Sequence, residues 1–273
     1  MDNRIKVIVN GLPGKMASEV ALAVSKAEDL SLAYYSLTGA GMPSELPIEH
    51  PLRWTEMKLI GPHEREILGE GLDYISVDYT QPDSVNSNAD FYCRHKLPFV
   101  MGTTGGDRKA LEQRVKDSQI CAVIAPNMAK PIVALQAMMK YAAENFAAYF
   151  KGYSLEIVES HQQGKKDTSG TAKAMVQYFN SMGIPFRDDQ IIMIRDPEKQ
   201  KEMGVPAEYL SGHGWHTYTL KSDDGNVLFK FTHNVNGRSV YANGTLDAIR
   251  FLDKKVKVGE KGKVYSMIDV LKG

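Results

Sequence analysis

Apolar residues in the first half of the chain fall in short runs separated by helical patterns, which predicts a parallel sheet. The run at 4–10, RIKVIVN, is rich in β-branched residues and lacks polar alternation, as expected of a strand buried on both faces. Similar runs follow at 30–37, 74–79, 97–101 and 120–125. Strands that alternate with helices indicate a doubly wound α/β domain.

The pattern changes after residue 128. A long, mostly apolar helix is expected at 132–150, and its methionine and aromatic stripe indicates core or subunit packing. Further on, Asp224-Gly225 predicts a hairpin turn between two strands. The alternation of Val227, Phe229 and Phe231 predicts an antiparallel sheet with one buried face.

The remaining patterns complete two domains. Strands are expected at 153–160, 191–195, 214–220 and 227–233, helices at 171–182 and 246–252, and an irregular segment at 41–61. We expect a dinucleotide-binding domain over 1–128, onto which the C-terminal segment 246–273 packs back. A second α+β domain with a mixed or antiparallel sheet is expected over 129–245.

A glycine-containing turn follows the first strand. Its residues are Gly11, Leu12, Pro13, Gly14, Lys15 and Met16, and a helical pattern continues to about residue 27. Strand, glycine turn and helix are the context of a Rossmann-type dinucleotide loop, in which phosphate meets the free N–H groups at the helix start. Because Pro13 stands where the motif GxGxxG has its middle glycine, an ordinary turn between strand and helix is the alternative.

The run at 30–37 ends without the carboxylate that usually binds the adenosine ribose. Ser36 and Thr38 stand there instead, and Lys15 lies in the glycine turn. Hydroxyl groups and a cation suit a 2′-phosphate, so the sequence favours NADPH over NADH. The alternative is that Ser36 and Thr38 only end the strand.

Two further turns follow predicted strands. The first contains Gly102, Thr103 and Thr104, and the second contains Ala125, Pro126, Asn127 and Met128. Ligands of doubly wound sheets lie at the carboxyl ends of the strands. We therefore expect both turns to converge with Gly11–Met16 on one cofactor crevice.

Composition and charge narrow the range of functions. The 273 residues carry 33 basic and 33 acidic side chains, so no net charge draws the chain to nucleic acid or to a membrane surface. No apolar run approaches the ~20 residues of a membrane span. Cys93 and Cys121 lie in apolar runs, which indicates buried thiols in a reducing compartment. Since the start, MDNRIKVIVNG, lacks the apolar core of a signal peptide, we expect a cytoplasmic protein, or one of the plastid stroma if a transit peptide has been removed.

The segment 159–171, ESHQQGKKDTSGT, is the candidate substrate site. His161 titrates near neutral pH and is a natural general acid, and Lys165 adds a cation. Ser169, Gly170 and Thr171 open the next predicted helix, whose free N–H groups can bind a carboxylate. We therefore expect an anionic substrate, and we expect this segment to meet the nicotinamide only when the two domains close.

Simpler roles remain open for several residues. Ser169 or Thr168 can act as a helix N-cap, Lys166 as a solvated charge, and Asp167 as a partner that orients Lys165. Histidines also occur outside the segment, at His213, His216 and His233. Because these histidines lack tight metal spacing, we expect them to be structural and predict no metal site.

Six segments together resemble a known family. They read VNGLPGKM, DYTQP, MGTTG, APNMA, ESHQQGKKDTSGTAK and HNVNGRSVYANGT. The chain resembles 4-hydroxy-tetrahydrodipicolinate reductase (the dihydrodipicolinate reductase family) of lysine biosynthesis, and its plant-type branch most closely. The resemblance extends over residues 5–250, and 159–171 is its most specific part.

The resemblance implies an activity and a site. The family reduces (2S,4S)-4-hydroxy-2,3,4,5-tetrahydrodipicolinate to tetrahydrodipicolinate with NADPH or NADH and releases water, in diaminopimelate and lysine biosynthesis. Its members are homotetramers of two-domain subunits. By resemblance, His161 and Lys165 are the proton donors. The residues that would hold the substrate carboxylates are Gln162, Ser169, Gly170 and Thr171, and those that would hold the cofactor are Gly11–Met16, Gly102–Thr104 and Ala125–Met128.

The chain also departs from the family pattern. Many bacterial members have a second histidine where this chain has Gln162, and a proline before the serine that is missing here. Gln162 can hydrogen-bond a carboxylate but adds no charge. The alternatives are another Rossmann-type reductase of a small dicarboxylate, such as an aspartate dehydrogenase, and an NADPH-binding sensor without catalysis. The proton donors gathered in 159–171 favour an enzyme, since a sensor needs no general acid.

Overall fold

A computed structural model of the chain describes residues 3–61 and 73–273, and these fold into two compact units. The first unit comprises Met1–Lys130 and Ser239–Gly273, and the second comprises Pro131–Arg238. The boundary expected after residue 128 lies close to this division. The boundary expected after residue 245 falls instead inside a helix that belongs wholly to the first unit.

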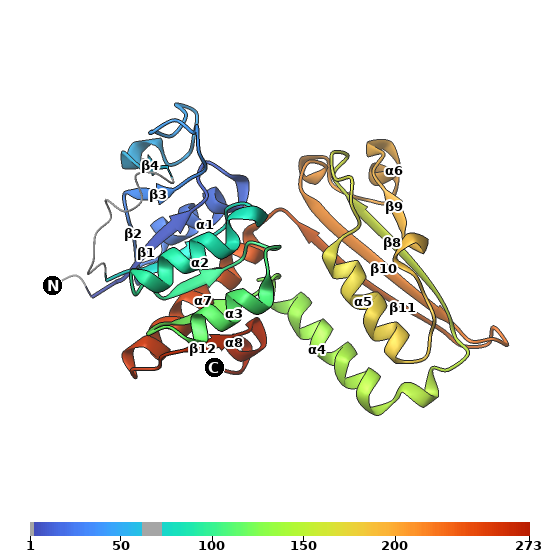
Figure 1. The fold of residues 1–273 in the computed structure, drawn as a ribbon. Coiled ribbons are helices and arrows are strands. Elements are labelled where there is room, and N and C mark those ends of the chain that lie inside the picture. Colours follow the sequence, from blue (N-terminus) through green and yellow to red (C-terminus); the bar gives the residue numbers. More distant parts are fainter. Residues whose placement is uncertain (1–2, 62–72) are drawn as a thin grey trace. The chain divides into compact units, whose positions relative to one another are not determined.

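A six-stranded parallel sheet forms the centre of the first unit (Figure 1). In spatial order its strands are β12 (Lys263–Tyr265), β7 (Cys121–Ile124), β6 (Phe99–Met101), β5 (Ile75–Asp78), β1 (Ile5–Asn10) and β2 (Leu30–Leu32). All neighbouring strands pair in parallel. The strand order reverses between β1 and β5, so this is where a doubly wound sheet opens a ligand crevice.

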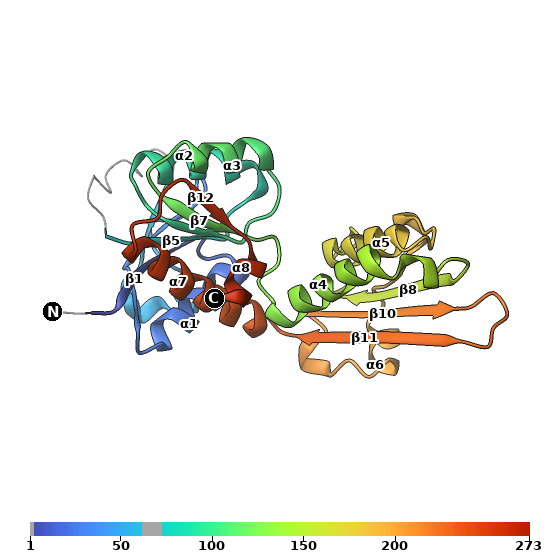
Figure 2. The same cartoon turned by 90° about the horizontal axis from the view of Figure 1, so that it is seen from below.

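Helices cover both faces of this sheet, which explains why its strands read as continuous apolar runs. The helices are α1 (Lys15–Lys26), α2 (Val85–Arg94), α3 (Arg108–Lys116), α7 (Ser239–Lys257) and α8 (Met267–Lys272). Figure 2 shows α2 and α3 on one face of the sheet and α1 and α7 on the other. The two cysteines are free and buried, as predicted. No helix among the described residues is long and apolar enough to cross a membrane.

The prediction of a single strand at 30–37 is wrong. The chain leaves the main sheet after β2, and β3 (Tyr35–Leu37) pairs with β4 (Lys58–Ile60) in a separate two-stranded parallel sheet. β4 and a short 3-10 helix, Arg53–Thr55, also lie in the segment expected to be irregular. An apolar run shows that residues are buried but does not show which strand they pair with, so the break at 33–34 is invisible in the sequence.

The helix expected at 246–252 is longer, because α7 begins at Ser239 and ends at Lys257. Gly244 makes the first part look unsuited to a helix. In the structure that glycine allows a close approach, since a Cβ atom at Gly244 would lie only 1.8 Å from the carbonyl oxygen of Met128. The expected packing of the C-terminal segment on the first unit is present, because β12 pairs with β7.

The second unit is built on a four-stranded mixed sheet in the order β11-β10-β8-β9. The strands are β8 (Ser154–His161), β9 (Ile192–Ile194), β10 (His213–Lys221) and β11 (Leu228–Asn236), and the helices are α4 (Lys130–Asn145), α5 (Gly170–Ser181) and α6 (Pro197–Glu202). β10 is antiparallel to both neighbours, and β9 is parallel to β8. Ile157, Tyr218 and Phe179 are fully buried in the core between sheet and helices.

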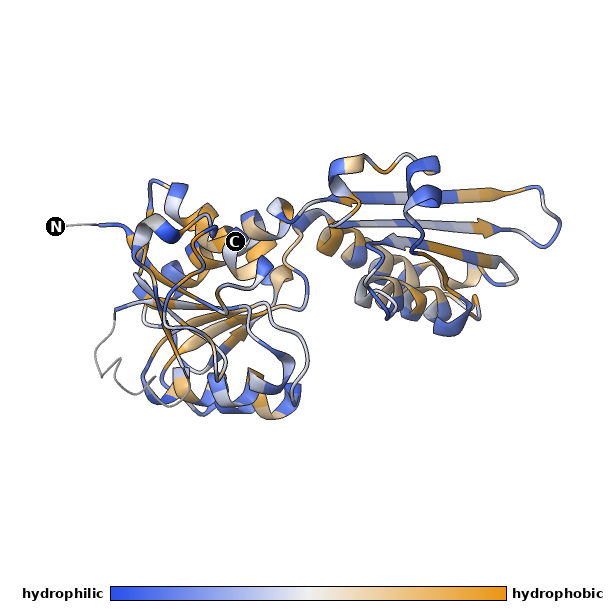
Figure 3. Cartoon of the chain, turned by 90° about the horizontal axis from the view of Figure 1, so that it is seen from above, coloured by the Kyte–Doolittle hydropathy of each residue, from blue (hydrophilic) through white to orange (hydrophobic). Residues whose placement is uncertain are grey.

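The predicted hairpin is present, but its expected buried face is not. Val227, Phe229 and Phe231 are 40%, 39% and 38% exposed. The core of this unit draws its strand residues from β8 and β10, whereas β11 lies at the edge of the sheet. Figure 3 shows hydrophobic segments along these strands in orange. An exposed apolar edge strand of this kind is a candidate surface for association.

Candidate functional site

The turn after β1 has the geometry of a phosphate-binding loop. Gly11 has φ 104°, and a Cβ atom there would lie 2.1 Å from the carbonyl oxygen of Tyr79, so only glycine fits. Gly14 is the N-cap residue of α1, and no side chain caps this helix start. The first N–H groups of the helix therefore face a site that suits an anion.

Ser36 and Thr38 support this turn from the neighbouring strand. The backbone N–H of Leu12 donates to the Ser36 hydroxyl (3.3 Å), and the Thr38 hydroxyl donates to the carbonyl oxygen of Leu12 (2.9 Å). Ser36 is fully buried, and its hydroxyl supports the backbone of the loop. Its contact with the cofactor stays a prediction, whereas Thr38 lines the cavity described next.

A cavity of about 720 Å³ opens between the turns that follow β1, β3 and β5. It is lined by residues of the glycine turn, by Thr38 and Gly39, and by Thr80, Gln81 and Asn88. Its volume suits part of a dinucleotide. Among the described residues that line it, Asp83 is the only charged one. Thr80 and Gln81 directly follow the strand expected at 74–79, so the rule that ligands lie at the carboxyl ends of strands could have identified them.

The turns after β6 and β7 lie at the same edge of the sheet but do not line this cavity. Asp78 is fully buried, and the Thr103 hydroxyl donates to its carboxylate at 2.5 Å. The backbone N–H of Thr80 in turn donates to the Thr103 hydroxyl (2.9 Å). Asp78 thus ties the turns after β5 and β6 together. At Gly102 a Cβ atom would lie 2.3 Å from the Tyr79 ring, so the chain needs glycine there as well.

In the second unit the structure places the site at the end of β8. His161 is the last residue of that strand rather than part of the loop. Glu159 lies two residues earlier, and His216 on β10 is in register with it. Ser169 is the N-cap of α5, and its hydroxyl accepts the N–H of Thr171 (3.2 Å), which confirms the simpler role foreseen for Ser169.

Glu159 is fully buried and forms the centre of the polar contacts at this site. One carboxylate oxygen accepts a hydrogen bond from Arg195 Nη2 (2.5 Å), and the other accepts one from the backbone N–H of Ser169 (3.0 Å). His216 Nε2 lies 3.7 Å and His161 Nε2 4.0 Å from the second oxygen. Burial raises the pKa of Glu159, but His216, Arg195 and the N–H of Ser169 outweigh burial and lower the pKa to about 2. Glu159 is therefore ionised at neutral pH.

The contacts of His161 define its protonation state. Its Nδ1 lies 2.9 Å from the backbone carbonyl oxygen of His213, which only accepts, so Nδ1 carries a proton. Its Nε2 is buried, has no hydrogen-bond partner among the described residues, and lies 4.0 Å from the Glu159 carboxylate. Burial and the neighbouring His216 lower the pKa of His161 to about 4, although Glu159 opposes this. The ring is therefore neutral at pH 7 in the unliganded protein.

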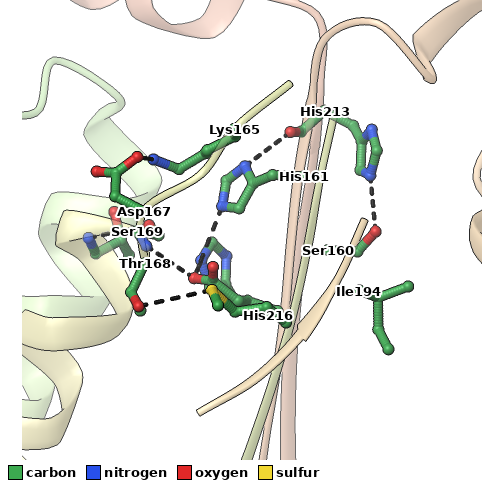
Figure 4. Close-up of polar contacts among 12 residues, drawn as sticks. Ser160, His161, Lys165, Asp167, Thr168, Ser169, Ile194, His213 and His216 are labelled. Carbon is green, nitrogen blue, oxygen red and sulfur yellow. Dashed lines mark hydrogen bonds and ion pairs between the residues drawn. The ribbon is translucent and has the colours of Figure 1, made fainter. Parts of the chain in front are cut away.

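Lys165 is the more accessible of the two candidate proton donors. Its side chain is 21% exposed, and its ammonium group donates to the carboxylate of Asp167 at 2.8 Å (Figure 4). This hydrogen bond lowers the pKa of Asp167, so the predicted pairing is present. Lys166 is exposed. Gly170 is also exposed, with no atom within 4 Å of a Cβ position built there, which leaves room for a ligand at the start of α5.

Donor atoms of Glu159, His161 and His216 lie within 4.8 Å of one another, close enough to suggest a metal site. Spacing along the chain could not reveal this group, because two members alternate on one strand and the third is a cross-strand neighbour. Both carboxylate oxygens, however, already accept hydrogen bonds, and the Arg195 guanidinium supplies the positive charge beside them. This arrangement favours the original expectation of no metal.

Comparison with known proteins gives a consistent result. Residues 5–128 match the family description "Dihydrodipicolinate reductase, N-terminus", and residues 132–271 match "Dihydrodipicolinate reductase, C-terminus". The chain is 46% identical to the probable 4-hydroxy-tetrahydrodipicolinate reductase 2, chloroplastic, of Oryza sativa subsp. japonica, over 97% of this chain and 82% of that protein. It is 45% identical to 4-hydroxy-tetrahydrodipicolinate reductase 1, chloroplastic, of Arabidopsis thaliana, over 99% of this chain and 78% of that protein.

Solved structures agree on the fold. Dipicolinate-bound dihydrodipicolinate reductase from Paenisporosarcina sp. TG-14 superimposes with a TM-score of 0.62 at 20% identity, covering 96% of this chain and 97% of that one. At this identity the likeness concerns the fold alone. It matches the predicted combination of a Rossmann-type domain and a second domain with a mixed sheet.

Proposed function

The chain belongs to the dihydrodipicolinate reductase family, and from this membership and its site we propose that it reduces 4-hydroxy-tetrahydrodipicolinate to tetrahydrodipicolinate, with release of water. It is an oxidoreductase whose first unit binds NAD(P)H. The reaction belongs to diaminopimelate and lysine biosynthesis. One observation carries the proposal: in a chain 46% identical to a plant reductase of that name, the end of β8 and the loop that leads to α5 bring together His161, Lys165 and the start of a helix.

The second unit offers two kinds of anion site for the two carboxylates of this substrate. The ammonium group of Lys165 neutralises one, in exchange for its hydrogen bond to the Asp167 carboxylate. The start of α5 receives the other through the N–H of Gly170 and the side-chain amide of Gln162, which is nearby in the chain, while the N–H of Thr171 is held by the Ser169 hydroxyl (3.2 Å). Ser169 contributes as the N-cap residue of α5, which fixes the position of the helix start.

The reaction consumes one hydride and one proton, and the protein supplies the proton. The nicotinamide, when bound, supplies the hydride. Carboxylates placed beside His161 favour its charged form and raise its pKa from the value of the unliganded protein. Because Nε2 faces Glu159, His161 delivers a proton only after its ring turns away from the His213 carbonyl. Lys165 needs no such movement, so we assign it the larger share of the acid role.

Mixing the purified protein with NADPH and freshly made hydroxy-tetrahydrodipicolinate tests the function. We expect the absorbance of the reduced nicotinamide to disappear in proportion to the substrate added. Oxaloacetate with ammonia serves as the control substrate for an aspartate dehydrogenase. Oxidation with the control alone would overturn the proposal in favour of that enzyme. Cofactor binding without any turnover would overturn it in favour of a sensor.

For the cofactor we propose a preference for NADPH. Thr38 and Gly39, which follow β3, line the cavity where other dinucleotide sites have a carboxylate, and Lys15, the last but one residue of the glycine turn, begins α1. We predict a higher kcat/KM with NADPH than with NADH. Replacing Lys15 with alanine should reduce the ratio of kcat/KM with NADPH to kcat/KM with NADH by up to about fivefold, the size of effect expected for an exposed charge pair. Lys26→Ala, at the other end of α1, is the control, and an unchanged ratio in Lys15→Ala would contradict the assignment.

For the assembly we propose a homotetramer in which β11 contributes to an interface. We predict that Phe229→Ser/Phe231→Ser shifts the protein to a smaller species in light scattering coupled to size-exclusion chromatography. These side chains are partly exposed on an edge strand, so serine there removes apolar contact area between subunits. Ile48→Ser, which changes an 86% exposed apolar residue of the first unit, should leave the mass unchanged. Equal masses for both variants would exclude β11 from the interface.

For the compartment we propose the plastid stroma or the cytoplasm. The plant relatives described above are named chloroplastic. Localisation of the tagged full-length gene product in its own cells tests this, and a signal in the secretory pathway would contradict it.

A further inference from the structure

Arg195 connects three parts of the substrate site, although nothing in the sequence marks it. It follows β9, and its side chain is only 17% exposed. Its Nε donates to the backbone carbonyl oxygen of Lys165 (2.8 Å), and its Nη2 donates to that of Asp167 (3.2 Å). Nη2 also binds the carboxylate of Glu159 (2.5 Å). One guanidinium thus holds the loop backbone at two points and joins it to the strand.

Glu159 extends this connection to the start of α5. Its other oxygen accepts the backbone N–H of Ser169, the N-cap residue of that helix. Arg195 and Glu159 together therefore fix the backbone at 165, 167 and 169. These positions set the direction of the Lys165 side chain and the place where the α5 N–H groups meet a carboxylate.

The donors of Arg195 are nearly all used inside the protein. A guanidinium has five N–H groups. Four hydrogen bonds are formed, to Lys165, Asp167, Glu159 and the carbonyl oxygen of Ile194. A group committed in this way has little capacity left for a substrate carboxylate. Its planar fork also fits several acceptors at fixed angles, which a lysine ammonium cannot reproduce.

We infer that Arg195 is a positioning residue of this enzyme, which holds the loop 162–169 in the conformation that presents Lys165 and the start of α5 to the dicarboxylate substrate. This inference rests on the proposed function. Arg195 acts through Lys165 and the helix start and does not touch the reacting atoms. Removing it releases the loop while leaving the cofactor crevice of the first unit intact.

Steady-state kinetics of Arg195→Ala and Arg195→Lys test the inference. We expect Arg195→Ala to lower kcat by about 10²-fold, the order of loss that follows from misplacing a catalytic group by an ångström. The KM for the dicarboxylate should rise, whereas the KM for the nicotinamide cofactor should not change. Arg195→Lys should fall between wild type and alanine, and added ethylguanidinium should restore part of the activity of Arg195→Ala. Arg187→Ala is the matched control, since the exposed Arg187 side chain pairs with the equally exposed Asp189.

A second variant separates positioning from folding. Arg195→Ala leaves Glu159 buried without its guanidinium, so the protein could unfold for that reason alone. Glu159→Gln/Arg195→Gln removes both charges, and we expect it to fold with wild-type circular dichroism and still show the raised KM for the dicarboxylate. Hydrogen exchange of the amides at 162–169 should be faster than in Arg187→Ala.

These experiments distinguish failure of the inference about Arg195 from failure of the proposed function. If wild-type protein does not oxidise NADPH with hydroxy-tetrahydrodipicolinate, the proposed function fails, whereas hydrogen exchange still reports on the loop. If wild type is active and the folded Arg195 variants keep its KM for the dicarboxylate and its loop protection, Arg195 is not a positioning residue. A parallel rise in the KM of the cofactor would also overturn the inference, because it would indicate general loss of structure.

Discussion

Lys165→Ala is expected to lower kcat by roughly 10²–10⁴-fold, the range for loss of a general acid. The Lys165 ammonium is the exposed cation of the site, held by Asp167 at 2.8 Å, and it needs no rearrangement to reach a ligand. The substrate KM should rise as well, because the same group neutralises a carboxylate. Lys166→Ala is the matched control: it removes an identical charge from the next, exposed position and should leave turnover unchanged.

His161→Gln separates the two candidate donors in the same assay. Glutamine can keep a hydrogen bond to the His213 carbonyl but cannot carry the transferable proton. We expect kcat to fall, yet by less than in Lys165→Ala, since the His161 Nε2 faces Glu159 in the resting structure. Wild-type turnover in both variants would remove this loop from the chemistry. A larger loss in His161→Gln would make the histidine the principal acid.

Much of the fold follows from local patterns that the sequence contains in full. The glycine turn after β1 was recognisable because strand, turn and helix are contiguous, and in the structure Gly11 has a positive φ. The hairpin at Asp224-Gly225 was recognisable for the same reason. Features that depend on residues far away in the chain were not recognisable in the sequence. The glycine at position 244, inside α7, is explained by the Met128 carbonyl, which is far away in the chain.

The candidate site likewise contains residues that the sequence could group and residues whose roles depend on distant contacts. His161, Lys165 and the start of α5 fall within one short segment, so the sequence could group them. Glu159 stands in that segment too, but its role depends on Arg195, which reaches it from the end of a different strand. The buried position of Ser36 was equally hidden, because a serine at a strand end reads as exposed. Local chemistry was therefore predictable, and the contacts that hold it in place were not.

Buried histidines make the stability of the second unit depend on pH. Burial, followed by the neighbouring His216, lowers the pKa of both His161 and His233 to about 4, from 6.5 in the unfolded chain. Above pH 6.5 both states are neutral and the full stability is present. As pH falls from 6.5 toward 4, the unfolded state binds protons that the folded state does not, so stability is lost. Glu159, with a pKa near 2, contributes stability above pH 4.5 that is lost only in stronger acid.

The expected loss is large enough to measure by urea unfolding. A shift of this size corresponds to roughly 3 kcal/mol for each histidine between pH 6.5 and 4, a large part of the stability of an ordinary domain. We predict that the free energy of unfolding of wild type falls by several kcal/mol over that interval. His161→Gln/His233→Gln should start lower at pH 7, because it disturbs a packed core, but should change much less with pH. If the free energy of unfolding changes with pH equally in the two proteins, these histidines are protonated in the folded state as readily as in the unfolded state. Their burial then does not lower the stability in acid.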